Sequence, residues 1–454
     1  MFGIDGASPE LVFGKWRKEL PTISKLIRGG VHANLRAPIP PISITSWNVI
    51  FSGRDPSELG IFGYSVKTAR GSRVITSKDI KTPRVWNILS KQKMRSVVLY
   101  VPLTYPAEKI NGAMVADFLT PSIKSNCAYP ASIKAEIKKL GDPELFFDVA
   151  VGLAGHKGLE PADLIRKTYK MTDMQTKLAA GLLEKEDWDL FIMTIVGSDR
   201  LQHMLWRHFD KNHRNYIRNS PHKNALLDYY RYLDKHLGKF IKKLPQNTHV
   251  IFLSDHGMVR QEGKININNW LMREGYLRLK PEYKKTLGAS KMRFSADMVD
   301  PKKSTAYASG AYHARIFINK KLAGRRYKSL QKELIRKIKA IPDDHGGKME
   351  TRVFKAGDIY KNPRHPECPD LTVYFDDLRW ASNPDFTGKG LYSFESAAGA
   401  DSAGHSREGV FVLSRPAAKN KKNACKIDAA RVAPTILKLL GAKIPSSIKA
   451  KPLI

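Results

Sequence analysis

The stretch His249-Val250-Ile251-Phe252-Leu253-Ser254-Asp255-His256-Gly257 decides the fold and the chemistry expected of this chain. Its β-branched and aromatic run predicts a buried strand, and a carboxylate and an imidazole follow at the carboxyl end, where ligands collect in α/β folds. Other strand-like runs adjoin similar residues: Asp5 follows 1–4, Asp199 and His203 follow 189–196, and His405 precedes 409–413. We therefore expect one site on the edge of one sheet.

The order of strand-like and helical patterns indicates the fold class. Strand-like runs stand at 96–101, 189–196, 249–253 and 409–413, with helical patterns between them. Continuous apolar strands are typical of sheets that are covered on both faces. The chain is therefore predicted to be an α/β protein with a mainly parallel central sheet, and a helix is expected at 434–440 near the end of the chain.

The pattern changes between about residues 276 and 394, where shorter alternating runs at 314–319 and 371–375 are separated by a helical stretch. We interpret 276–394 as a small α+β cap inserted into a core made of 1–275 plus 395–454. The segment 103–181 is interpreted as a second insertion that faces the substrate.

The amino-acid composition bears on the binding partners of the protein and on the cellular compartment in which it works. Of 454 residues, 77 are Lys or Arg and 43 are Asp or Glu, and the resulting net charge of +34 should attract anions. The basic residues are dispersed, and no motif supports binding to nucleic acid or to an acidic membrane surface, so both partners stay open. Three distant cysteines argue against a disulfide framework. Without a membrane-spanning run or a secretory pattern, we expect a soluble, cytoplasmic protein.

The Asp and His residues are more informative together than singly. Asp255-His256 alone also fits a helix cap beside an ordinary histidine. Asp199 and His203 are four residues apart, so their side chains can lie on one face of a helix and converge on one cation. Taken as a set, carboxylate oxygens and imidazole nitrogens suit zinc, manganese or iron. The six residues Asp5, Asp199, His203, Asp255, His256 and His405 are enough to hold two metals.

A nucleophile is predicted where Pro40-Pro41-Ile42-Ser43-Ile44-Thr45-Ser46-Trp47 leads into an apolar helical pattern. A hydroxyl at the start of a helix benefits from the positive end of the helix dipole and from free backbone N–H groups. Ser43 or Thr45 as a plain cap of the helix is the alternative interpretation.

In this order, these motifs resemble the type I phosphodiesterase/nucleotide pyrophosphatase branch of the alkaline phosphatase superfamily. The resemblance spans nearly the whole chain and includes Pro102-Leu103-Thr104-Tyr105-Pro106, Cys368-Pro369-Asp370-Leu371 and Ala433-Pro434-Thr435-Ile436-Leu437. It implies an alkaline-phosphatase-like core of three α/β/α layers with an inserted cap. It also implies that Asp199, His203 and His405 hold one divalent metal and that Asp5, Asp255 and His256 hold the other.

Within this resemblance Ser43 is the nucleophile between the metals and is also expected as a metal ligand. Zinc is the metal expected first. Many family members have threonine where Ser43 stands, and serine keeps the hydroxyl. Some nucleotide-cleaving members have asparagine where Ser46 stands. Only four residues precede Asp5, so we expect that the first strand is truncated or that the true start lies upstream. Arg200, Gln202 and Arg407 lie beside predicted ligands and suit either of two roles, which are orienting a ligand and contacting phosphate.

The function expected first is that of a two-metal phosphoester hydrolase, specifically a phosphodiesterase/nucleotide pyrophosphatase that acts on a small anionic phosphoester through a phosphoseryl intermediate. One alternative is a phosphomonoesterase or phosphotransferase of the same superfamily that acts on a lipid or glycan head group. A second alternative, from a different class, is a non-catalytic protein that binds metal or nucleic acid.

Overall fold

The computed structural model describes residues 1–68, 71–149, 159–284, 292–386, 388, 390–394, 401–414 and 426–454. The chain forms two compact units. The core unit comprises residues 1–61, 75–258 and 405–454, and the second unit comprises 62–74 and 259–404. The chain passes between the units after residues 61 and 74, and again within strands β10 (Gly257–Arg260) and β18 (Ala403–Ser406). The predicted cap boundaries stay predictions, and the expected return to the core at residue 395 lies outside the described residues.

A nine-stranded sheet forms the centre of the core unit, in the order β20-β2-β19-β9-β1-β8-β5-β6-β7. Its strands, in chain order, are β1 (Phe2–Ile4), β2 (Gly30–Arg36), β5 (Ser96–Leu99), β6 (Gly112–Val115), β7 (Ala128–Tyr129), β8 (Leu190–Ile195), β9 (Val250–Leu253), β19 (Glu408–Ser414) and β20 (Lys426–Asp428). The prediction of an α/β fold is confirmed, and five of these strands, β1, β5, β8, β9 and β19, lie at the predicted runs.

The sheet is mixed, although its middle is parallel as predicted. Strands β9, β1, β8, β5 and β6 run in one direction. Strand β19 runs antiparallel to both β9 and β2, and β7 runs antiparallel to β6. The reversal of β19 has a consequence for the site, because the amino end of β19 then lies at the same edge as the carboxyl ends of the central strands.

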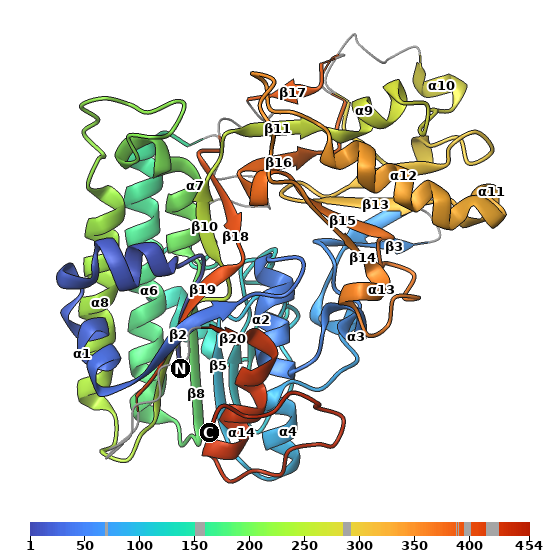
Figure 1. Cartoon of the computed structure of the whole chain (residues 1–454). Coiled ribbons are helices and arrows are strands. Elements are labelled where there is room, and N and C mark those ends of the chain that lie inside the picture. Colours follow the sequence, from blue (N-terminus) through green and yellow to red (C-terminus); the bar gives the residue numbers. More distant parts are fainter. Residues whose placement is uncertain are drawn as a thin grey trace. The chain divides into compact units, whose positions relative to one another are not determined.

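Helices cover both faces of this sheet, which gives three layers (Figure 1). One layer contains α1 (Pro21–Gly29), α6 (Pro161–Lys185), α7 (Gly197–Phe209) and α8 (Ala225–Lys243), and the other contains α2 (Ser43–Ser52), α4 (Val85–Lys91) and α14 (Val432–Leu439). The shorter helices α3 (Pro56–Leu59) and α5 (Ile133–Lys139) complete the unit. Every residue of β8 is buried, as expected for a strand covered on both sides.

The second unit is built on smaller sheets. Its strands are β3 (Ser65–Thr68), β4 (Gly71–Val74), β11 (Gly263–Asn266), β12 (Ala306–Ser309), β13 (Ala314–Ile318), β14 (Arg352–Lys355), β15 (Leu371–Tyr374), β16 (Trp380–Asn383) and β17 (Tyr392–Ser393). Its helices are α9 (Ile267–Arg273), α10 (Pro281–Lys284), α11 (Lys320–Ala323), α12 (Tyr327–Lys339) and α13 (Ala356–Ile359). Helix α12 contributes Leu330, Leu334 and Ile338 to the hydrophobic core of this unit.

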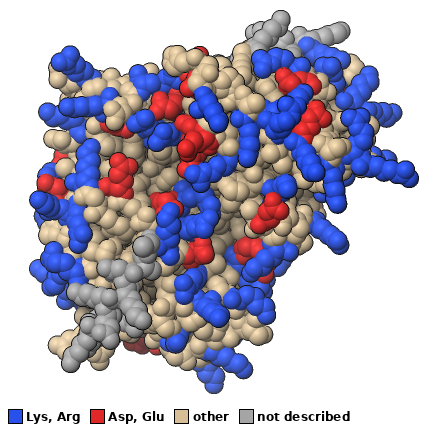
Figure 2. All heavy atoms as spheres, in the orientation of Figure 1, with Lys and Arg blue, Asp and Glu red and all other residues tan. Residues whose placement is uncertain are grey.

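The surface reflects the excess of basic residues. Lys and Arg side chains are spread over the face shown in Figure 2, with fewer Asp and Glu side chains among them. Within the described ranges, no helix combines the length and the apolar composition needed to cross a bilayer.

Candidate metal centre and nucleophile

The carboxyl edge of the parallel strands brings the predicted ligands together. Asp5 follows β1, and its backbone N–H donates to the carbonyl oxygen of Ile195 at the end of β8, 2.9 Å away. Asp255 and His256 follow β9 directly. Because β9, β1 and β8 are adjacent and parallel, the residues after each strand meet at one edge.

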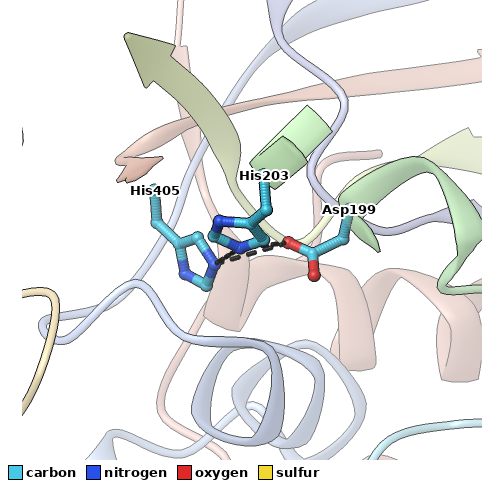
Figure 3. A group of neighbouring side chains, drawn as sticks. All are labelled: Asp199, His203 and His405. Carbon is cyan, nitrogen blue, oxygen red and sulfur yellow. Dashed lines mark hydrogen bonds and ion pairs between the residues drawn. The ribbon is translucent and has the colours of Figure 1, made fainter. Parts of the chain in front are cut away.

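One cluster consists of Asp199, His203 and His405, which point toward one another in Figure 3. Oδ1 of Asp199 lies 3.3 Å from Nε2 of His203 and 3.4 Å from Nε2 of His405. The two imidazole nitrogens are 3.2 Å apart. Asp199 and His203 stand one turn apart on α7, whereas His405 comes from β18. The remaining nitrogen of His405, Nδ1, lies 2.9 Å from the carbonyl oxygen of Pro41, which fixes the ring with Nε2 toward Asp199.

A second cluster surrounds His256. Nε2 of His256 lies 3.4 Å from Oδ1 of Asp5 and 3.2 Å from Oδ2 of Asp255. Ligand atoms of Asp5, Asp199 and His256 also lie within 4.8 Å of one another, so Asp199 adjoins both clusters. Oδ2 of Asp255 is buried, and apart from its 3.2 Å contact with His256 no hydrogen-bond partner for it occurs among the described residues. A buried carboxylate oxygen that receives no hydrogen bond fits a metal ligand.

Ser43 is the first residue of α2, next to the second cluster. Its Oγ donates to Oδ1 of Asp5 at 3.2 Å and lies 3.4 Å from Nε2 of His256. The residue before the helix, Ile42, is extended, and no side chain caps the first turn in the described structure. The alternative that Ser43 or Thr45 caps this helix is wrong, because Ser43 lies inside the helix and the hydroxyl of Thr45 donates to the carbonyl oxygen of Ile61.

Burial controls the electrostatics of the site. Burial, and then the charge of Asp199, raises the pKa of Asp5 to about 8. Burial, and then Asp5, raises the pKa of Asp255 well above its ordinary value. Burial also acts to raise the pKa of Asp199, but the charge and hydrogen bonds of His203 and His405 outweigh it and hold that pKa well below the ordinary value.

Burial lowers the pKa of the imidazoles, whereas it raises the pKa of the carboxyl groups. Burial, and then the charge of His405, lowers the pKa of His256, and burial lowers the pKa of His405 despite the opposing effect of Asp199. Neutral imidazoles beside buried carboxyls are donors suited to a divalent cation, whose charge would reverse the raised carboxyl pKa values. The oxygen and nitrogen donors of this site therefore fit metal ions.

Several supporting side chains were not predicted as part of the site. Nε1 of Trp47, one turn after Ser43 on α2, donates to Oδ2 of Asp5 at 2.9 Å. The hydroxyl of Ser198 donates to the carbonyl oxygen of Asp5 at 2.6 Å. The backbone N–H of Ala7 donates to Oγ of Ser254 at 2.8 Å. In the sequence, only the i, i+4 spacing of Ser43 and Trp47 could have indicated that Trp47 lies beside the nucleophile.

The structure also assigns contacts to the three polar residues beside the ligands. The guanidinium of Arg200 bonds to Asp148 and to Asp199. Nε2 of Gln202 donates to the carbonyl oxygens of Gly6 and Ser198, and Nη2 of Arg407 donates to that of Ala37. The contacts of Gln202 and Arg407 brace the backbone around the site.

All seven predicted site residues thus lie at one edge of the core sheet. Six are the predicted Asp and His ligands, and the seventh is Ser43, which was predicted as nucleophile and as a metal ligand. Their division between two metals, and the role of Ser43, stay predictions.

Comparison with known proteins identifies a family for the chain. A family model described as "Type I phosphodiesterase / nucleotide pyrophosphatase" matches residues 1–401. No match was found among curated proteins.

Solved structures share the fold over almost the entire chain. Human ectonucleotide pyrophosphatase/phosphodiesterase 5 aligns with a TM-score of 0.56 and 14% identity, covering 98% of this chain and 96% of that one. An inactive variant of the murine protein, solved in complex with AMP, aligns with a TM-score of 0.55 and 13% identity, covering 98% and 96% of the two chains. At this level of identity the likeness establishes the fold.

Proposed function

Because the chain belongs to the type I phosphodiesterase/nucleotide pyrophosphatase family and is a metal-dependent hydrolase, we propose that it cleaves phosphodiester or pyrophosphate bonds in two steps through an intermediate on Ser43. The observation that carries the proposal is the position of the Ser43 hydroxyl, 3.2 Å from Oδ1 of Asp5 and 3.4 Å from Nε2 of His256. A nucleophile in contact with ligand side chains is the arrangement that metal-assisted phosphoryl transfer requires.

The proposed metal ligands follow the two clusters. Asp199, His203 and His405 hold one ion, and Asp5, Asp255 and His256 hold the other, with Ser43 beside the second cluster. We propose zinc, because a mixed set of imidazole and carboxylate donors suits it. When bound, the two cations supply positive charge for the phosphoryl oxygens and make hydroxyl protons more acidic.

The chain's own residues account for the remaining chemistry. In the first step a bond forms between Oγ of Ser43 and phosphorus, and the bond to the leaving group breaks. The leaving group is an alcohol from a phosphodiester or a phosphate from a pyrophosphate. The Ser43 hydroxyl donates to Oδ1 of Asp5, which is the direction in which its proton departs, and the leaving group gains a proton. In the second step one water cleaves the Oγ–P bond and restores the serine hydroxyl, so each turnover consumes one water.

The start of helix α2 supports binding of the phosphoryl group. Ser43 is the first residue of this ten-residue buried helix, and its first-turn N–H groups have no side-chain cap in the part of the chain that is described. The positive end of the helix dipole lies at the same place. An anionic phosphoryl oxygen is therefore favoured beside Ser43.

The proposed substrates are small phosphodiesters, with nucleotide diesters the first class to test. The murine relative was solved with AMP, which supports a nucleotide. Ser46, three residues after Ser43, stands where some nucleotide-cleaving members have asparagine. This difference argues against a specific preference for nucleotides over other small diesters, and the Ser46 side chain is fully buried.

A paired assay tests the proposal. Metal-stripped protein reconstituted with Zn²⁺ or Mn²⁺ is given bis(p-nitrophenyl) phosphate and p-nitrophenyl phosphate in parallel. We expect faster hydrolysis of the diester, and no hydrolysis of either compound after Ser43→Ala. A preference for the monoester would favour a phosphomonoesterase. Inactivity on both compounds, together with tight and salt-sensitive binding to DNA or RNA, would favour a non-catalytic protein.

A further inference from the structure

Arg200 is buried beside the metal centre, although arginine is rarely buried without a charged partner. It follows the predicted ligand Asp199 on α7, and its side chain is 8% exposed. The guanidinium also lies over the ring of Phe118, with its central carbon 4.9 Å from the ring centre. The contacts of this buried guanidinium with its neighbours therefore bear on how the ligand Asp199 is held.

Three nitrogens of this guanidinium make hydrogen bonds. Nε donates to Oδ1 of Asp148 at 3.1 Å, and Nη2 donates to Oδ2 of Asp148 at 2.9 Å. The two residues therefore form a bidentate ion pair. The third nitrogen, Nη1, donates to Oδ2 of Asp199 at 3.1 Å. The side chain of Asp148 is 8% exposed and that of Asp199 is 2% exposed, so the whole chain of contacts is shielded from water.

Because of this contact, the two oxygens of Asp199 have different partners. Oδ2 bonds to Arg200, whereas Oδ1 faces the imidazoles of His203 and His405 at 3.3 and 3.4 Å. Rotation of the carboxylate about its terminal bond would break the hydrogen bond from Arg200. Since Asp148 holds the guanidinium by both of its oxygens, the plane of the guanidinium is fixed as well.

We propose that Arg200 and Asp148 are positioning residues that make Asp199 a ligand through one oxygen, Oδ1, with Oδ2 reserved for Arg200. This proposal rests on the proposed metal-dependent function. It goes further by assigning two residues that do not touch the metal, and by giving Arg200 the role of orienting a ligand rather than contacting phosphate. Partners of ligating carboxylates commonly affect metal affinity or activity by about 10- to 100-fold.

The test uses Co²⁺ as the probe, because the visible absorption of Co²⁺ reports the geometry of its ligands. The variants are Arg200→Lys, which keeps the charge but not the planar fork, Arg200→Gln, and Asp148→Asn, which keeps the shape of the side chain. The matched control is Arg166→Gln on α6, where an exposed arginine pairs with Asp163 at 2.9 Å. Metal-stripped proteins are titrated with Co²⁺ by calorimetry and absorption, and circular dichroism verifies folding.

We expect the Arg200 and Asp148 variants to bind one of two Co²⁺ ions about 10- to 100-fold more weakly, with a changed spectrum for that ion and unchanged binding of the other. Arg166→Gln should behave as wild type. If an Arg200 variant does not fold, Asp148→Asn alone decides the result. Unchanged Co²⁺ affinity and spectrum in folded variants, with a raised KM for the diester, would overturn this proposal alone. Failure of the wild type to bind Co²⁺ would overturn the proposed function together with it.

Discussion

Trp47 donates a 2.9 Å hydrogen bond from its indole Nε1 to Oδ2 of Asp5. The other oxygen of the same carboxylate, Oδ1, accepts from Oγ of Ser43 at 3.2 Å. Ser43 and Trp47 are one turn apart on α2, so a single helix positions both oxygens of a predicted metal ligand. The orientation of Asp5 therefore depends on α2 as much as on its own strand.

Removal of this indole donor should weaken the site. Trp47→Phe keeps an aromatic ring but loses the hydrogen bond to a buried carboxylate, which typically contributes about 1.5–3 kcal/mol. We expect kcat/KM for the diester to fall by about tenfold or more and the affinity for one of the two metals to fall with it. The control is Trp270→Phe in the second unit, a buried tryptophan of that unit's own hydrophobic core. Equal loss of activity in both variants would mean that Trp47 acts only through packing.

Gly3 should be essential for the same contact. A Cβ atom at residue 3 would lie 2.5 Å from Cη2 of Trp47, so alanine must displace the indole that holds Asp5. We expect Gly3→Ala to lower the free energy of unfolding by about 1–3 kcal/mol, as overpacking commonly does, and to lower activity as well. Gly14→Ala is the matched change, because no atom lies within 4 Å of its added Cβ. Thermal or urea unfolding of both variants measures the difference, and equal stability would contradict this packing.

Metal removal should make stability sensitive to pH. Between about pH 7.5, one unit above the ordinary histidine pKa of 6.5, and about pH 8, the pKa of Asp5, the imidazoles of His256 and His405 are essentially neutral in both the folded and unfolded states. Burial lowers the pKa of the N-terminal amine to about 5, so its contribution to stability rises with pH over this range, but it is one group against two. The carboxyl groups of Asp5 and Asp255 therefore set the trend. Because folding raises their pKa values, their contribution to stability is fully present below the unfolded pKa of 3.8 and is lost as the pH rises through the folded value.

We therefore expect the Tm of metal-stripped protein to fall as the pH rises from about 7.5 to 8, whereas the metal-loaded protein should be much less sensitive. Binding of Zn²⁺ at pH 7 should also release protons, because the carboxyl groups must ionise to bind it. Scanning calorimetry, and metal titration in buffers of different ionisation enthalpy, measure these two effects. A Tm of the stripped protein that rises over this range would contradict the assignment of buried, protonated carboxyls.

The sequence was sufficient to predict the strands on which the site is built. Strands β8 and β9 are continuous apolar runs, and the Asp and His residues that follow them belong to short motifs, so fold class and site residues could be inferred together. The antiparallel course of β19 was not predicted, because an apolar run has the same pattern in either direction. His405 nevertheless reaches the site because of this reversal, since it precedes its strand rather than following it.

The supporting contacts could not be predicted in the same way. The bond from Trp47 to Asp5 and the ion pair between Arg200 and Asp148 join residues 42 and 52 positions apart, and each depends on which atom of a side chain faces which neighbour. Single-sequence patterns report the periodicity of a helix or strand and contain no such information. Trp47 stood within a recognised motif, whereas Asp148 lay in a segment that had been interpreted as an insertion.

The central claim is that Ser43 forms a covalent bond to phosphorus. Metal-loaded enzyme mixed with bis(p-nitrophenyl) phosphate and quenched in acid within one turnover should, by peptide mass spectrometry, carry a p-nitrophenyl phosphoryl group on Ser43, because only one of the two p-nitrophenols has left. The Ser43→Ala variant should carry none while retaining the metal content of the wild type and losing turnover. A variant that hydrolyses the diester at the wild-type rate, or a p-nitrophenyl phosphoryl group on a different residue, would contradict the claim.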